Sequence, residues 1–297
     1  MESKEKKITV RDVAKEAGVS VATVSYILNN RTDQKISAAT KKKVLQIANL
    51  LNYKPNHAAK SLAEGRNNII GITYKLTAET PARNLEIMTL ANRLIPQLAR
   101  RNYDVLFLQI PETTEDASVS RNVDAILAID LTHEDFRALA DSYLVPIIGI
   151  DMVINDNLFY QVYTDYPSII QDVVSTLNTE NYYILTDGFS NEKYQALLNE
   201  VVPTEKLLIY DCSDKVSLAH IKHTKVIILG THLALIAQSF ISLDDMVVVT
   251  SEDTASLLPE GVSKVFIDMD KKANLSINLL LNATNRKFEV AHEFKIK

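Results

Sequence analysis

The sequence predicts a small all-α head followed by a larger α/β core built from parallel sheets. Apolar residues recur at helical spacing in about the first 50 positions. From Ile69 onward, near-continuous apolar runs alternate with helical patterns, which is typical of buried parallel strands. The charge divides in the same way: residues 1–68 carry 13 Lys and Arg against six Asp and Glu, a net +7, and the rest carries 19 against 31, a net −12. A basic head favours a polyanion such as DNA as partner, although solvated faces alone could give the same counts.

Length and composition exclude several other classes of protein. The chain has 297 residues, 46% hydrophobic and 23% charged, which predicts two or three globular units. A single cysteine, Cys212, excludes an internal disulfide framework, and the six histidines are not at ligand spacing, so we expect no metal and no cofactor. No apolar run reaches about 18 residues, and the charged first nine residues lack the apolar centre of a secretion signal. We therefore expect a cytoplasmic protein without a membrane partner.

The first two helices of the head form a helix-turn-helix pattern. Thr9 and Asp12 mark a helix start, and Gly18 ends that helix, because glycine accepts a left-handed backbone. Ser20 then caps a second helix, with Val24 among its buried residues. Two short helices joined by a tight glycine turn predict a helix-turn-helix, although a plain helical hairpin would share much of the pattern.

A third helix and a short fourth one complete the head. The third is expected over about 37–51, with Lys41–Lys43 facing outward, and Pro55 breaks it. The fourth would begin at Asn56 and consist of small residues around Leu62. So short a helix barely forms in isolation, so we expect it to fold against DNA and a second copy. The predicted domains are a head at 1–54, a hinge helix and linker at 55–68, and a core at 69–297.

These segments resemble a known family of regulators. VRDVAKEAGVSVATVSYILN, followed by ISAATKKKVLQIANLLNYKPNHAAKSLAEGRNNIIGI, is similar to the head and hinge of the LacI (lactose-repressor) family over residues 8–72. The resemblance implies a homodimer that reads a pseudo-palindromic operator, with the second helix in the major groove and paired hinge helices in the minor groove. It also implies that Leu62 is the wedge that kinks the duplex.

The resemblance assigns DNA contacts position by position. Val21, Ala22 and Tyr26 fall where the family reads base edges. Many members carry Arg at the position of Tyr26, so this chain is expected to favour thymine-methyl contacts, and a half-buried structural Tyr26 is the alternative. The remaining contacts implied, to phosphates, backbone or groove floor, are Ser20, Thr23, Ser25, Asn29, Lys35, Ser37, Tyr53, Asn56, His57, Ala59 and Lys60.

The pattern of the core predicts two Rossmann-like lobes, which agrees with the periplasmic-binding-protein-like core of the family. The expected strands are 69–74, 103–109, 123–129, 145–150, 181–186, 206–210, 225–230, 246–250 and 263–267. The expected helices include 83–101, 165–178, 191–201, 232–241 and 270–282, of which 83–101 serves partly as core and partly as a self-pairing surface. Ligands of such lobes bind outside the carboxyl ends of the strands.

The effector pocket is expected at these strand ends, but it departs from the family pattern. Sugar-binding members carry Arg-x-x-Gly-aromatic, Asn-Asp and Asp motifs where this chain has KYQAL (193–197), THLAL (231–235) and TSEDT (250–254). Strand-end acids often only cap helices, so the effector site is not located by them, and a reduced or non-sugar pocket is one hypothesis. The candidate effector-binding residues are Tyr74, Gln109, Asp151, Lys193, Thr231 and Asp253.

The function expected is a transcriptional regulator, a repressor whose operator affinity a small molecule modulates, with sugars as one candidate class. The alternative is an effector-independent regulator that binds or bends DNA and carries a vestigial sensor. An enzyme is not expected, because the chain lacks G-x-G-x-x-G, phosphate-loop and G-x-S-x-G motifs. Cys212 lies near His220 and His223 in sequence, but we assign it a structural role.

Overall fold

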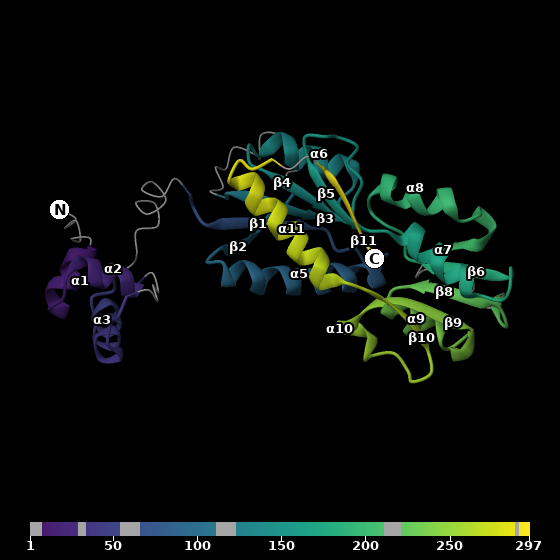
Figure 1. Cartoon of the computed structure of the whole chain (residues 1–297), viewed down its shortest axis with the longest axis horizontal. Coiled ribbons are helices and arrows are strands. Elements are labelled where there is room, and N and C mark those ends of the chain that lie inside the picture. The colour runs from purple at the N-terminus through teal and green to yellow at the C-terminus, as the bar shows by residue number, and fades with distance from the viewer. Residues whose placement is uncertain (1–7, 29–33, 54–65, 111–122, 211–220, 289–290) are drawn as a thin grey trace. The chain divides into compact units, whose positions relative to one another are not determined.

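The computed structural model describes residues 8–28, 34–53, 66–110, 123–210, 221–288 and 291–297. The chain divides into two compact units, residues 1–67 and 68–297 (Figure 1). Most of the predicted hinge, including Leu62, lies outside the described residues, as do Cys212 and His220.

The described part of the first unit is a bundle of three short helices: α1 (Val10–Ala17), α2 (Val21–Leu28) and α3 (Ala38–Leu50). The Asp12 carboxylate accepts bonds from the N–H and the hydroxyl of Thr9, at 2.8 and 2.7 Å, and Gly18 ends α1 with φ of 66°. Side chains from all three helices close one core, as predicted: Val13, Ala14, Ala17, Val24, Ile27, Val44 and Ala48.

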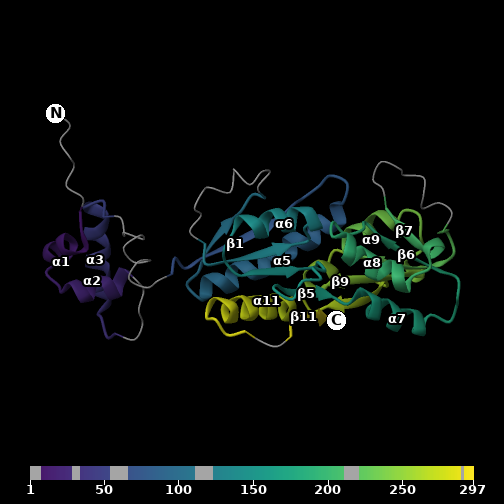
Figure 2. The same ribbon diagram turned by 90° about the horizontal axis from the view of Figure 1, so that it is seen from above.

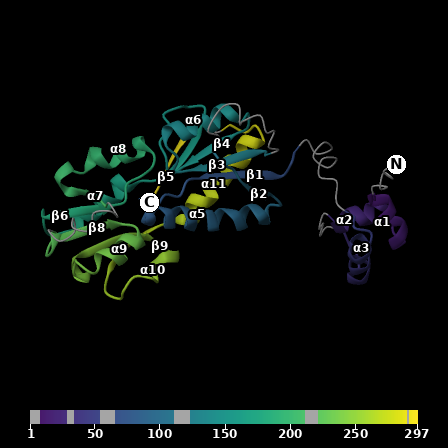
Figure 3. The same cartoon turned by 180° about the vertical axis from the view of Figure 1, so that it is seen from behind.

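The second unit contains two parallel sheets, each in its own lobe (Figure 1), and Figure 3 shows the two lobes from behind. The first sheet runs β11 (Glu293–Ile296), β5 (Tyr160–Thr164), β4 (Ile147–Ile150), β3 (Ala125–Ile129), β1 (Ile69–Tyr74), β2 (Asp104–Phe107). The second runs β10 (Ser263–Ile267), β9 (Met246–Ser251), β8 (Lys225–Leu229), β6 (Tyr182–Thr186), β7 (Leu207–Ile209). In both sheets the strand order reverses between the first strand and the third, at β1/β3 and at β6/β8. Such a reversal opens a crevice at the carboxyl ends of those strands.

Helices cover both faces of each sheet. In lobe 1 (residues 68–164 and 269–297), α5 (Pro81–Arg100) and α11 (Met269–Thr284) lie side by side on one face, and α6 (His133–Ser142) covers the other (Figure 2). In lobe 2 (residues 165–268), α7 (Tyr166–Thr176) and α8 (Glu192–Val201) pack on one face and α9 (Thr231–Ala237) on the other. The remaining elements are α10 (Glu252–Ala255) and two 3-10 turns, Thr204–Lys206 and Leu243–Asp245.

Both lobes were predicted, but some elements were missed. The strand β5 reads YQVYT, a polar-looking sequence, yet all five residues are buried because the strand lies between β4 and β11. The strand β11 alternates Glu293 and Lys295 with apolar residues at the sheet edge, and α6 was also missed. The helix α9 ends at Ala237, four residues before the predicted end. Among the described residues, no helix has both the length and the apolar character that crossing a membrane requires.

Candidate nucleic-acid interface and inter-lobe cleft

The start of α2 presents the predicted base-reading residues to solvent. Ser20 Oγ accepts a bond from the Thr23 N–H at 3.0 Å and lies 2.8 Å from Thr23 Oγ1, so it caps the helix. Val21 is 42% exposed and Ala22 is also exposed, although apolar side chains of this size are more often buried. Tyr26, one turn further, is half-buried. The N-terminal end of α2 is thus free to approach a DNA groove, and its capped amides favour phosphate.

The start of α3 adds hydroxyl and basic groups. Ser37 Oγ caps α3 by accepting from the Thr40 N–H at 3.1 Å, and Lys35 and Lys41–Lys43 are exposed. Tyr53 packs half-buried against the head core. Ser25 is half-buried in α2, and the remaining predicted contacts lie outside the described residues: Asn29, Asn56, His57, Ala59, Lys60 and Leu62. The described head therefore carries a cationic, hydroxyl-bearing face of the kind that contacts phosphates.

In the core, the crevice between the lobes is occupied by a buried cluster of charges. Its centre is Arg83 in the first turn of α5, whose side chain is 3% exposed. Nε of Arg83 donates to Asp130 Oδ2 at 2.8 Å, Nη1 donates to Glu86 Oε2 at 2.7 Å, and Nη2 lies 3.2 Å from Asp151 Oδ2. Lys272 of α11 binds the two oxygens of Asp151 at 2.8 and 3.0 Å. We call these five residues the inter-lobe charge cluster.

Burial and neighbouring charges shift the pKa values of Asp151 and Glu86 in opposite directions. Burial alone would raise the pKa of Asp151, but the charges of Lys272 and Arg83 outweigh it and lower that pKa. Burial raises the pKa of Glu86, and the opposing effect of Arg83 is smaller. Burial also disfavours the charged form of Arg83, yet Asp130, Asp151 and Glu86 outweigh it and raise its pKa. Arg83 and Asp151 are therefore held charged, and Glu86 takes up a proton more readily than an exposed glutamate.

Lobe 2 binds directly to the elements that carry this cluster. Asp187, after β6, accepts bonds from the N–H groups of Ala82 and Arg83 at 2.6 and 3.1 Å, and burial raises its pKa. Asn191 accepts from the Val153 N–H at 3.0 Å and donates to the Leu131 carbonyl at 3.2 Å. Further bonds between the lobes join Tyr166 OH to Glu86 (3.3 Å), Ser190 Oγ to Asp130 (3.4 Å) and the His133 N–H to Glu192 (3.2 Å).

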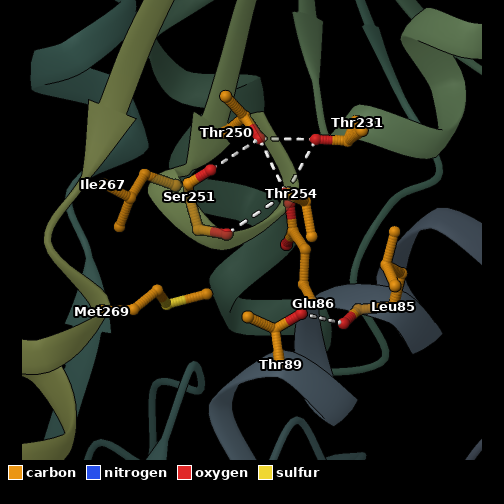
Figure 4. A pocket seen from close by; sticks show the side chains of 9 residues that line it. All are labelled: Leu85, Glu86, Thr89, Thr231, Thr250, Ser251, Thr254, Ile267 and Met269. Atoms are coloured by element: carbon orange, nitrogen blue, oxygen red, sulfur yellow. Dashed lines mark hydrogen bonds between the residues drawn. The ribbon is translucent and has the colours of Figure 1, made fainter. Parts of the chain in front are cut away.

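A small cavity lies beside the cluster (Figure 4). Thr231, Thr250 and Thr254 turn their hydroxyls toward one another, and Glu86 and Thr89 of α5 line the opposite side. Its volume is about 10 Å³, room for about one water. Pockets that hold small ligands usually measure about 300–1,000 Å³, so this cavity is too small for a sugar.

The predicted effector residues do not converge on one pocket, and five of them already contact the chain's own groups. Asp151 belongs to the charge cluster, and Thr231 belongs to the hydroxyl group of Figure 4. Asp253 pairs with Arg93 of α5, and Lys193 Nζ lies 3.5 Å from the Ile154 carbonyl oxygen. Tyr74 and Gln109 line an open surface groove of about 570 Å³ at the ends of β1 and β2, where the Tyr74 ring lies 4.9 Å from that of Phe107.

Sequence reasoning missed the centre of the cluster. Asp130, Asp151 and Asp187 all follow strands directly, and Asp151 was among the predicted effector residues. Asp268 also follows a strand, and its Oδ1 caps α11 by accepting a bond from the Lys271 N–H at 2.7 Å. Arg83 and Lys272 lie in segments that read as ordinary amphipathic helices, so no local signal marks them. Among the described residues, no group of three or more His, Cys, Asp or Glu side chains is arranged to hold a metal ion.

The two units together define a helix-turn-helix protein with a periplasmic-binding-protein-like core. The resemblance of the head to the LacI family is confirmed over residues 9–56, which match the family model described as "Bacterial regulatory proteins, lacI family". Among solved structures, the chain is similar to a lac repressor dimer bound to operator and the anti-inducer ONPF, with a TM-score of 0.65 and 18% identity over 98% of this chain and 97% of that one.

Curated relatives are regulators of transcription in bacteria. The fructose operon regulatory protein of Vibrio cholerae is 30% identical over 162 residues, 51% of this chain and 48% of the relative. Catabolite control protein A of Staphylococcus aureus is 27% identical over 218 residues, 69% of this chain and 64% of the relative. The alignments thus span about half to just under two thirds of the length of these relatives.

Proposed function

We propose that this chain is a sequence-specific DNA-binding regulator, a repressor that binds a pseudo-palindromic operator as a homodimer. The observation that carries the proposal is the exposed N-terminal end of α2, with Ser20, Val21 and Ala22 facing solvent on a basic head. Side chains at this end of a recognition helix reach base edges in the major groove. The lacI-family match of the same segment supports the assignment.

The homodimer is supported by exposed apolar side chains of α5 in lobe 1. Met88 and Ile95, about two helical turns apart on one side of α5, are 37% and 42% exposed. Exposed apolar side chains on one side of a helix are typical of an interaction site. A second copy of the chain would bring two heads to the two halves of an operator.

For control by effectors, two candidates stand. The first is a repressor whose operator affinity a small molecule modulates, as the sugar-operon names of several relatives suggest. The second is an effector-independent regulator, and the charged, nearly filled inter-lobe cleft favours it. An effector shifts the equilibrium between two states of the core only if it binds them with different affinities. To bind in this cleft, it also needs space between the lobes.

The experiment that tests the proposal is selection of bound DNA from a random pool, followed by gel-shift titration at fixed salt. We expect a motif with two inverted half-sites. We expect Leu62→Ala to weaken operator affinity roughly tenfold while the core stays folded, because an aliphatic wedge stabilises the kinked duplex. Leu50→Ala, at an 84% exposed position of α3, is the matched control. Recovery of no motif would contradict DNA binding, and unchanged affinity of Leu62→Ala would contradict the wedge.

A further inference from the structure

We propose that the core carries its own ligand: the guanidinium of Arg83 occupies the place of a small-molecule effector in the inter-lobe cleft, while the backbone of the same residue binds lobe 2. The regulatory consequence rests on the proposed function, whereas the occupancy of the cleft rests on the core alone.

Arg83 lies where a fold of this kind binds its ligands. Asp130 follows β3 and Asp187 follows β6, and both therefore lie at the strand-order reversals of the two sheets. Ligands of open α/β sheets bind at such reversals, outside the carboxyl ends of the strands. The chain places the first turn of α5 between these two ends, so Arg83 reaches the crevice from the chain itself.

The surroundings of Arg83 resemble a binding site for a guanidinium ion, in which Nε and Nη1 donate hydrogen bonds and Nη2 makes an ion pair without a hydrogen bond. Nε, Nη1 and Nη2 each face a different carboxylate, those of Asp130, Glu86 and Asp151, within 2.7–3.2 Å. The ring of Phe189 lies 5.0 Å from the guanidinium carbon, at a distance typical of cation–π contacts. Planar guanidinium groups are suited to this combination of several acids and an aromatic face.

Groups from both lobes contact Arg83. The three carboxylates belong to lobe 1, whereas Phe189 and Asp187 belong to lobe 2. Asp187 also accepts the backbone N–H of Arg83 at 3.1 Å, so the same residue is bound to lobe 1 by its side chain and to lobe 2 by its backbone. Opening the lobes would separate Asp187 and Phe189 from Arg83, and the Asp187 carboxylate would lose the backbone donors that it binds.

Little space remains for a second ligand. The cavity next to Glu86 measures about 10 Å³, and the hydroxyls that line it bind one another (Figure 4). A sugar could enter only by displacing Arg83 from three carboxylates. We therefore infer a core that stays closed without an external effector and an operator affinity that does not respond to sugars.

The first test is chemical rescue in the full-length protein. Arg83→Ala should lower the Tm of the core by about 10 °C, because it leaves buried acids without their cation. Methylguanidinium chloride at about 10 mM should fill the vacated site and raise the Tm of this variant by several degrees, compared with equal NaCl. It should leave wild type and Arg137→Ala unchanged; Arg137 is a surface arginine with an ion pair to Asp156 and a 52% exposed side chain. An unchanged Tm for Arg83→Ala, or no rescue, would overturn the proposal.

A second variant covers the case in which Arg83→Ala does not fold. Arg83→Lys keeps the charge but lacks the planar fork that meets three acids, so we expect a folded protein with an intermediate loss of Tm. A wild-type Tm for Arg83→Lys would show that the guanidinium group is not required for the stability of the core.

The third test addresses external ligands. A ligand that binds only the folded state raises the Tm. Because the cleft is occupied, mono- and disaccharides and their phosphate esters, each at 10 mM, should leave the wild-type Tm unchanged. An increase of 2 °C or more with any of them would contradict an occupied cleft. None of these measurements uses DNA, so a failure of operator binding and a failure of the internal ligand are distinguishable.

Discussion

At the scale of single residues, substitutions of Tyr26 and Glu86 give the most direct tests of operator binding and of pH-dependent stability. Tyr26 lies half-buried one turn into α2. Glu86 lies between a salt bridge to Arg83 and the small polar cavity. Each residue can be tested by one substitution and one matched control.

Tyr26→Ala should weaken binding to the selected operator by roughly 5–30-fold, because a lost base contact costs about 1–2 kcal/mol. The salt dependence of binding should not change, since no phosphate contact by a cation is removed. Gel-shift titrations at several salt concentrations measure both quantities, with Gln46→Ala on the exposed face of α3 as control. Wild-type operator affinity in Tyr26→Ala would favour the purely structural interpretation of this residue.

Glu86→Gln should reduce the loss of stability that wild type shows as pH rises. Burial raises the pKa of Glu86, so between its unfolded value of about 4.3 and its higher folded value the native state binds more protons than the unfolded state. The free energy of unfolding therefore falls as pH rises through that window. Glutamine does not titrate in this range. The remaining fall of the free energy of unfolding with pH should therefore come from Asp187, whose pKa is also raised.

Urea unfolding of full-length wild type and variant between pH 4.5 and 8 measures this difference. Glu200→Gln, on an exposed position of α8, is the matched amide substitution. Equal pH slopes in wild type and Glu86→Gln would show that Glu86 is not the group responsible.

At the scale of elements, the start of α5 depends on the other lobe. The residue before the helix, Thr80, makes no side-chain cap, and Pro81 opens the first turn. The buried N–H groups of Ala82 and Arg83 are instead bound by Asp187, more than 100 residues further along the chain. A helix start buried between two lobes requires such acceptors.

Asp187→Ala should therefore lower the free energy of unfolding of the core by about 1–3 kcal/mol, because two buried donors lose their acceptor. Asp187→Asn keeps an oxygen in the same place and should cost less. Denaturant titration gives the energies, and hydrogen exchange of the segment that starts α5 should accelerate in Asp187→Ala. If the Ala variant is as stable as wild type, Asp187 does not hold this helix end.

At the scale of the whole molecule, the proposed homodimer is assigned to the exposed apolar side of α5. Ile95→Glu should convert the dimer to a folded monomer at about 10 µM, because a charge in an apolar interface loses its hydration without gaining a partner. Light scattering after size exclusion measures the mass. Leu144→Glu places the same charge on a fully exposed leucine of lobe 1, away from α5, and should remain dimeric. A dimeric Ile95→Glu protein would move the interface elsewhere.

Much of the fold follows from local patterns. Thr9, Gly18 and Ser20 mark the helix ends of the head within one residue, because capping and left-handed backbone are properties of single residues. The apolar runs that became β1, β3, β4 and β8 are buried on both faces, so composition alone marks them. By contrast, β5 and β11 contain polar residues whose burial or edge position depends on neighbouring strands, and their own sequences do not show it.

By itself, the sequence determined the two-part plan of a basic helical head and an acidic α/β core, because helix ends, apolar periodicity and charge are written in neighbouring residues. Only the tertiary structure decided what fills the cleft between the lobes. Arg83, Asp130, Asp151, Glu86 and Lys272 come from four separate segments and meet only after both sheets have formed. Contacts between residues far apart in the chain leave no periodic signal, and a buried arginine reads locally like any other helix residue.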